Sequence, residues 1–525
     1  MTHSKTTLSA KTSSPQAPSV PVIRVIDVSQ SRILNLSWPI ILSNISVPLL
    51  GLIDTAILGH LNSTKPMAAV AIGAQVMTMV LWSFGFFRMS TTALTARRSG
   101  ASDDAGVHSI LRQALLFTLP ISLLCTVLLA LFSPTVLNWF GNYTQVHELA
   151  QNYITVRCWG IPLVFFQYCL IGWFIGRGET RVPLLMLVVA NVVNAVLDYV
   201  FVWHLHLSTS GVALGTVIAD GISVSIGLAV AFRKGAFLSL FSNVKNANIK
   251  NANIKKANNK NTSIKNISSK EDQSSASVPF QKYSTFKESE LKESVLEKWR
   301  VDTQFIKRFV HINSDLFIRT ITLLSVFAIF TAQGAKQGSD VVAANAIIIS
   351  LLLFISNALD GFAHAAETLV GQTLGQKQFA KTQKAIWLTG VNCAGIALCL
   401  TLAFMLGSDY LLPLFTSHSD ILATLEPLHY YLILLPLVGF ASYWLDGIMI
   451  GAQASNAMRN SMLLAAFGIF IPWLWYHDTF LDVAQNHESN RILWQGLYAF
   501  LLARALFLLP TLVTLWRQPT QYLEK

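Results

Sequence analysis

The chain has 525 residues, of which 53% are hydrophobic and only 12% are charged. Soluble globular proteins carry about 25% charged residues, so this composition excludes a soluble protein and predicts many membrane-spanning segments. The sequence has no phosphate-binding loop and no HExxH or GxSxG pattern. It therefore gives no support for an enzyme or for transport driven by ATP, and we expect no cofactor and no metal centre.

Twelve apolar segments are long enough to cross a membrane, and the predicted fold class is an all-α membrane protein with twelve transmembrane helices. The polar residues before them lack the hydrophobic core of a cleavable signal peptide, so the first segment is expected to direct insertion. The segments cover about residues 33–59, 67–96, 110–132, 147–176, 182–205, 211–232, 306–333, 342–371, 382–406, 424–453, 457–476 and 491–515.

Basic residues gather in one set of the connecting loops, which also includes both termini. Because such loops stay in the cytoplasm, we expect both termini inside a bacterial inner membrane. The expected regions are a disordered N-terminus (1–30), a first six-helix bundle (31–232), a basic low-complexity linker (233–302), a second six-helix bundle (303–517) and a tail (518–525).

The linker region carries most of the net charge of the chain. Residues 233–308 hold sixteen Lys and Arg against seven Asp and Glu, which is +9 of the total +11. The tract lacks the interleaved aromatic residues of a nucleic-acid-binding surface, so we expect no nucleic-acid partner. A disordered cytoplasmic linker in weak contact with anionic lipid is expected instead.

The two halves are related by a constant offset of 275 residues. Gly100 corresponds to Gly375, Gly172 to Gly447, and Ile175-Gly176 to Ile450-Gly451. A constant offset indicates two bundles of one design, and an even number of crossings gives both the same orientation. The sequence thus predicts a parallel pseudo-two-fold repeat, with a substrate path between the bundles.

Acidic and polar residues gather in segments one, five and six. A carboxylate inside a spanning helix is costly, so it indicates a function. At ~1.5 Å per residue, Asp54 and Asp198 lie at middle to outer depths, and Asn194 precedes Asp198 by one turn. Two nearby carboxylates in a low dielectric do not both ionise, so one is expected to hold a proton. The expected proton- or cation-coupling residues are Asp54, Asn194, Asp198, Thr216 and Asp220.

Two further expectations concern the same bundle. Pro48 removes a backbone donor six residues before Asp54 and is expected to bend the first helix. Asn191 lies one turn before Asn194 on the same face and is a candidate for the substrate path. The alternative is that Asp54 is merely interfacial and that Asp198 is a structural acid with satisfied hydrogen bonds.

A second group of charges lies nearer the cytoplasmic ends of the helices. Arg88, Asp360 and Asp446 are candidates for the substrate path or for a gate, and interfacial pairing is the simpler interpretation. Asp315 and Arg319 are four residues apart in segment seven, a spacing that predicts an ion pair on one helix face.

Four motifs carry a family resemblance: Val47-Pro48-Leu49-Leu50-Gly51-Leu52-Ile53-Asp54-Thr55-Ala56, Arg88-Met89-Ser90-Thr91-Thr92, Leu359-Asp360-Gly361-Phe362-Ala363 and Leu445-Asp446-Gly447. They resemble the multidrug and toxic compound extrusion (MATE) family, and within it the branch of the bacterial DNA-damage-inducible protein F. The resemblance covers about residues 30–240 and 303–517. The resemblance implies a two-lobed antiporter with alternating access, and it places the cation or proton site at Asp54, Asn194 and Asp198, with Thr216 nearby.

We therefore expect a monomeric secondary antiporter that exports organic cations or amphipathic toxic compounds and contacts membrane lipids. The coupling ion is expected to be H⁺, with Na⁺ at Asp54 and Asp198 as the alternative. Two other functions stay open. A flippase for lipid-linked intermediates would need a deep basic cavity, and a membrane scaffold would depend on the basic linker.

Overall fold

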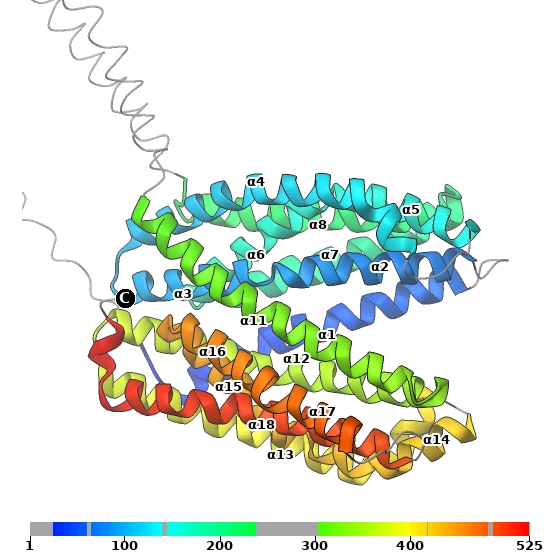
Figure 1. The fold of residues 1–525 in the computed structure, drawn as a ribbon. Coiled ribbons are helices and arrows are strands. Elements are labelled where there is room, and N and C mark those ends of the chain that lie inside the picture. The colour runs from blue at the N-terminus through cyan, green and yellow to red at the C-terminus, as the bar shows by residue number, and fades with distance from the viewer. Residues whose placement is uncertain are drawn as a thin grey trace, which may run out of the picture.

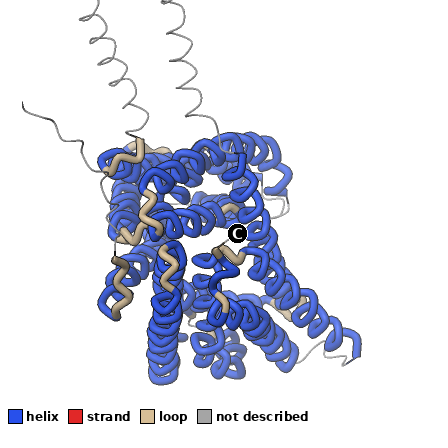
Figure 2. Tube along the Cα trace, turned by 90° about the vertical axis from the view of Figure 1, so that its left-hand side faces the viewer, coloured by secondary structure: helices blue, strands red, loops and turns tan. Residues whose placement is uncertain are grey.

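The computed structural model describes residues 25–59, 65–138, 144–237, 303–416, 418–480 and 487–523. Within residues 47–56, 58–59, 144, 478–480 and 487–488 it describes the helix path only. All regular structure in the described residues is helical (Figure 2). The longer elements are α1 (Gln30–Gly59), α2 (Lys65–Ser83), α3 (Phe86–Gly100), α4 (Asp104–Leu137), α5 (Thr144–Cys158), α6 (Ile161–Gly176), α7 (Arg181–Tyr199), α8 (Ser208–Arg233), α11 (Thr303–Ala335), α12 (Ser339–Gly375), α13 (Phe379–Phe415), α14 (Ser419–Leu425), α15 (His429–Ala452), α16 (Ser455–Ala465), α17 (Ile471–Phe480) and α18 (His487–Arg517).

These elements form the twelve predicted membrane crossings. Ten helices in the described residues are long and apolar enough to span a membrane, with α2 and α3 joined as one. The pair α5 and α6, bent by 50° between Cys158 and Ile161, forms an eleventh. The 30-residue apolar helix α1 is the twelfth. The chain is therefore an all-α membrane protein, as its hydrophobic pattern predicts.

The helices form two lobes that meet at one end of the molecule (Figure 1). We call α1 to α8 the first lobe, α11 to α18 the second lobe, and the end that carries Gly100, Arg233, Gly375 and Arg517 the linker end. The lobes lie together at the linker end and apart at the opposite end. Figure 2 looks onto the linker end, where the C-terminal residues lie between two groups of helices.

The first helix of each lobe begins against the other lobe. In α1, the side chain of Asn392 on α13 donates to Gln30 at 3.0 Å, and Asn44 donates to the carbonyl of Asn357 on α12 at 3.2 Å. In α11, the ring of Phe309 stacks on Phe87 of α3. Figure 1 shows α1 and α11 crossing from one lobe to the other, so the two lobes share their first helices.

Equivalent glycines bring helices together in both lobes, as the repeat predicts. A Cβ on Gly176 would lie 2.8 Å from the carbonyl oxygen of Thr92, so α6 touches the backbone of α3. A Cβ on Gly451 would lie 2.6 Å from the carbonyl oxygen of Glu367, which places α15 equally close to α12. Small residues at such crossings allow the close backbone packing that holds membrane helices together.

Candidate functional site

A buried polar cluster connects α7 and α8 in the first lobe. The side-chain amide of Asn194 donates to the carboxylate of Asp198 at 3.0 Å and to the hydroxyl of Thr216 at 3.4 Å. Asn194 and Asp198 are 1% and 0% exposed, so the carboxylate is removed from solvent. We call these three residues the first-lobe polar cluster. The structure therefore brings together three of the five residues that the sequence suggests for ion coupling.

The packing of α8 fixes where this carboxylate lies. The Oδ1 atom of Asp198 occupies the space that a Cβ on Gly215 would take, one residue before Thr216. Only glycine leaves room for the acid against the backbone of α8 at this position. Asp198 is therefore held between α7 and α8, in direct contact with the backbone of α8.

The same face of α7 is joined to α1. One turn before Asn194, the amide of Asn191 donates to the hydroxyl of Ser46 at 2.8 Å. The backbone of α1 continues as helix through residues 48 and 54. The side chains of Pro48 and Asp54 lie outside the described residues, so the predicted bend and the predicted acid pair stay predictions.

Asp220 forms an ion pair in a separate part of the first lobe. Its carboxylate lies 2.9 Å from the guanidinium of Arg157 on α5, and both side chains are nearly buried. Arg157 is not among the candidate residues predicted from the sequence, although a single arginine inside an apolar run predicts a carboxylate partner. Asp220 therefore pairs with an arginine of α5 and is not part of the first-lobe polar cluster.

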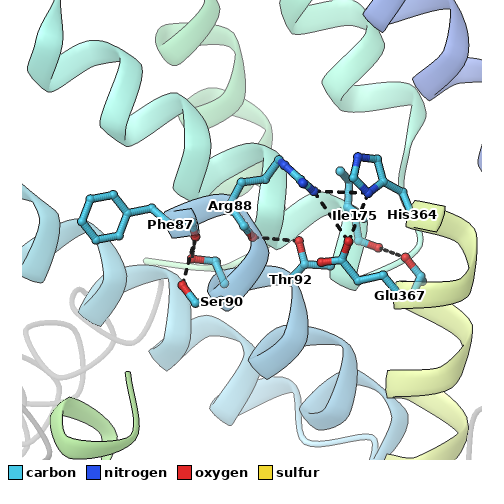
Figure 3. Close-up of polar contacts among 9 residues, drawn as sticks. Phe87, Arg88, Ser90, Thr92, Ile175, His364 and Glu367 are labelled. Atoms are coloured by element: carbon cyan, nitrogen blue, oxygen red, sulfur yellow. Dashed lines mark hydrogen bonds and ion pairs between the residues drawn. The ribbon is translucent and has the colours of Figure 1, made fainter. Parts of the chain in front are cut away.

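A second cluster joins the two lobes in the half of the molecule nearer the linker end, and Figure 3 shows its contacts. The guanidinium of Arg88 on α3 lies 3.6 Å from the carboxylate of Glu367 and 3.3 Å from Nδ1 of His364, both on α12. His364 and Glu367 contact each other at 3.1 Å, and Glu367 is 0% exposed. We call these three residues the interlobe cluster. The structure therefore places the gate candidate Arg88 in an ion pair between the lobes.

Three hydrogen bonds reinforce the interlobe cluster. Thr368 and Gln372 of α12 donate to the carbonyl oxygens of Ile175 and Gly176, each at 2.9 Å, and so satisfy carbonyl groups that end α6. Gln453, just after α15, donates to the carbonyl of Ala93 at 3.0 Å. Together these contacts tie the lobes to each other at the linker end.

The second lobe holds its own buried charges. Asp446 of α15 accepts from Arg504 of α18 at 2.7 Å and from Arg319 of α11, so one carboxylate lies between two guanidinium groups. Asp360 of α12 is half-buried, and Asp446 and Arg319 are among its charged neighbours.

The predicted pairing of Asp315 with Arg319 is wrong. Asp315 accepts from Ser455 at 2.8 Å and also pairs with Arg459 on α16. Arg319 pairs with Asp446 instead. Spacing of four residues places both side chains on one face of α11, but that face is buried and packs against other helices. Each charge therefore pairs with a residue of a neighbouring helix, Asp315 with Arg459 and Arg319 with Asp446.

Comparison with known proteins identifies the family of the chain. The MatE family model matches residues 39–200 and 316–475, which is more than half of the sequence. The chain belongs to the MATE family. Its similarity to DNA damage-inducible protein F of Escherichia coli K12 is 31% identity over 93% of this chain and 92% of that protein. The MATE family resemblance suggested by the sequence is therefore confirmed.

More distant relatives and solved structures are also similar to this chain over nearly its whole length. The chain is 23% identical to the probable multidrug resistance protein NorM of Geobacillus kaustophilus, over 93% of this chain and 95% of that protein. The crystal structure of the Vibrio cholerae MATE transporter VcmN in the bent form superposes with a TM-score of 0.71 at 16% identity, covering 94% of this chain and 98% of that one. The MATE fold thus extends over both lobes.

Proposed function

We propose that the chain is a cation-coupled antiporter that exports organic cations or amphipathic toxic compounds, with H⁺ as the coupling ion. The observation that carries this proposal is the buried carboxylate of Asp198, which is held by Asn194 and lies against Gly215. A carboxylate excluded from water gains most from binding a proton or a small cation, because either neutralises its charge.

Asn194 is suited to respond to the protonation of Asp198. Its amide nitrogen donates to Asp198 and Thr216, whereas its carbonyl oxygen is buried and has no hydrogen-bond partner in the described part of the chain. A protonated carboxyl group becomes a donor that needs an acceptor. Rotation of the Asn194 amide brings its oxygen toward the new donor and ends the bond to Thr216, so proton binding loosens α7 from α8.

The first helix carries this change to the substrate path. Asn191 binds Ser46 one turn away, so a shift of α7 pulls on α1 just before Pro48. In this mechanism Asp54 adds a second acid on α1, and bending at Pro48 changes the shape of the first lobe. Since α1 also contacts the second lobe, its movement alters the path between the lobes and expels substrate.

The orientation follows from charge. The linker end carries Arg97, Arg98, Arg181, Lys377 and Arg517. By the positive-inside rule, this charge supports a cytoplasmic location for the linker end, in a bacterial inner membrane. In this proposal the interlobe cluster closes the cytoplasmic side, and the arrangement is an outward-facing state into which protons enter and from which substrate leaves.

Proteoliposome counterflow tests the proposal. Proteoliposomes that contain the purified protein are loaded with a fluorescent organic cation such as ethidium. Proton and sodium gradients are then imposed across the vesicle membrane in separate experiments. We expect export driven by the proton gradient, lost in Asp198→Asn and Asp54→Asn, and retained in Asp340→Asn, which changes an exposed acid at the opposite end of the molecule. Full, pH-dependent export by both Asp198→Asn and Asp54→Asn would contradict proton coupling at this site, and a response to sodium alone would assign Na⁺.

The lipid-linked flippase is the second candidate, and the charges weigh against it. Arg157, Arg319 and Arg504 each contact a carboxylate in the described structure, so they do not offer a basic cavity to a phosphate group. The scaffold alternative depends on the linker, most of which lies outside the described residues. Deletion of residues 243–275 distinguishes it, because a transporter keeps its export activity and a scaffold loses its function.

A further inference from the structure

An apolar groove opens on the outer surface of the second lobe near the linker end. It has a volume of about 710 Å³, within the range of small-molecule sites, and is formed by α13, α15 and α18. Three tryptophans shape it. Trp444 forms part of the wall, and Trp387 and Trp516 lie at the rim with exposed fractions of 65% and 39%. Because these helices span the membrane, the groove faces lipid.

A glycine creates the space. A Cβ on Gly390 would lie 2.8 Å from Cζ2 of Trp444, so the indole ring rests directly on the backbone of α13. The ring is fixed there by a hydrogen bond of 3.1 Å from its nitrogen to the hydroxyl of Thr389. The groove is therefore a formed feature with an ordered wall, and a larger residue at position 390 would fill it.

One cation, Arg517, lines the groove, and a second, Lys384, lies on α13 one turn before the lining residue Trp387. The side chain of Gln383 on α13 donates to the carbonyl of Trp516 on α18 at 2.9 Å, which places the ends of these helices side by side. Lys384 and Arg517 are the next residues along each helix, and both are exposed. Neither forms an ion pair within the described ranges. The mouth thus combines positive charge with tryptophan, the pattern of a membrane–water interface.

The repeat does not reproduce this site in the first lobe. At the offset of 275 residues, Gly390 corresponds to Leu115 and Trp444 to Cys169, while Lys384 corresponds to Ser109. The first lobe therefore has a bulky side chain where the groove would open and no cation at the position of Lys384. The groove is therefore specific to the second lobe and does not follow from the repeat.

We propose that the groove binds one anionic phospholipid of the linker-end leaflet, with its phosphate at Lys384 and Arg517 and an acyl chain beside Trp444 and Gly390. Basic pockets between transmembrane helices bind acidic head groups in this way. The groove is apolar, opens toward the bilayer and has its cations at the interfacial end, so its chemistry fits an anionic lipid better than a soluble anion. This site is independent of the ion-coupling residues.

Native mass spectrometry of the full-length protein in detergent tests the proposal. The protein is titrated with palmitoyl-oleoyl phosphatidylglycerol, with the zwitterionic phosphatidylcholine of the same chains, and with glycerol phosphate as the head group alone. We expect phosphatidylglycerol to bind most tightly and glycerol phosphate to bind most weakly. The double variant Lys384→Gln/Arg517→Gln should weaken phosphatidylglycerol binding about 30-fold, because each cation near a membrane surface contributes about fivefold.

Two further variants separate the parts of the site. Gly390→Leu, which introduces the residue of the first lobe, should abolish tight binding of either lipid. Arg181→Gln/Arg233→Gln removes two exposed cations at the linker end of the first lobe and should leave binding unchanged.

Three outcomes overturn the proposal. They are equal affinity for the two lipids, unchanged phosphatidylglycerol binding in Lys384→Gln/Arg517→Gln, and binding of glycerol phosphate as tight as that of phosphatidylglycerol, which would assign the site to a soluble anion. If Gly390→Leu does not fold, the Lys384 and Arg517 variant decides the question.

Discussion

The guanidinium of Arg88 lies 3.6 Å from the carboxylate of Glu367, although the two residues belong to different lobes. Glu367 is fully buried, and His364 also contacts its carboxylate. The repeat places Ala363 at the position equivalent to Arg88 and Thr92 at the position equivalent to Glu367. The ion pair is therefore a single contact that breaks the two-fold symmetry of the fold, and it lies where the lobes would separate in the proposed transport cycle.

Glu367→Gln should favour an arrangement that is open at the linker end. The substitution leaves Arg88 partly buried without its carboxylate, at a cost of about 3 kcal/mol to the closed arrangement. The distance across the linker end is measured by pulsed electron paramagnetic resonance between two spin labels. The labels are attached to Arg181→Cys and Lys384→Cys, which replace exposed residues of the two lobes. The five native cysteines are replaced by alanine beforehand. We expect longer distances in Glu367→Gln.

The exchanged variant Arg88→Glu/Glu367→Arg serves as the control for this experiment. It restores opposite charges between α3 and α12, so shorter distances should return. If Glu367→Gln leaves the distance distribution of the wild type intact, the pair does not hold the lobes closed.

Asp446→Asn should destabilise the second lobe strongly. The carboxylate of Asp446 lies between Arg319 and Arg504, and its removal leaves two guanidinium groups buried without their shared partner. Breaking a buried ion pair in this way costs about 3–5 kcal/mol. A thermal unfolding assay in detergent should show a clear fall in melting temperature.

The control for Asp446 is Asp409→Asn, because the side chain of Asp409 is 84% exposed. An exposed ion pair contributes about 0–1 kcal/mol, so this variant should unfold at nearly the temperature of the wild type. Equal melting temperatures for Asp446→Asn and the wild type would contradict a balancing role for this acid.

Arg157 and Asp220 should act as a structural pair. Either Arg157→Gln or Asp220→Asn leaves one buried charge without its partner and should lower stability. The double variant removes both charges and should recover much of that loss. Export by the double variant should keep its pH dependence, measured by counterflow over a pH series. If export by the double variant no longer depends on pH, Asp220 would instead be part of the coupling site.

Gly451→Val should disrupt the contact between α15 and α12. Its side chain would meet the backbone of Glu367, and overpacking of this kind costs about 1–3 kcal/mol. Gly395→Ala is the matched control, because a Cβ there meets nothing within 4 Å. Comparison of the melting temperatures of the two variants tests whether the repeated glycines hold the helices of each lobe together.

Much of the fold could be predicted from hydrophobic runs, because a membrane helix is defined by its own composition. The charge partners could not. Asp315 and Arg319 have ideal spacing, yet each finds its partner on another helix, and only packing in three dimensions decides this. Asn194 and Asp198 share one helix, so their contact follows from the sequence. Arg504 is a single arginine in an apolar run, which indicates a carboxylate partner, but only the packing of the helices identifies that partner as Asp446.

The crossing of α1 and α11 bears on how the molecule is made. Each of these helices begins against the lobe that the other half of the chain supplies, through contacts such as Asn44 with Asn357 and Phe309 with Phe87. The first half cannot complete its own packing while the ribosome is still translating the rest. Final assembly therefore waits for insertion of the second half, and fragments divided between residues 237 and 303 should be active only when they are produced together.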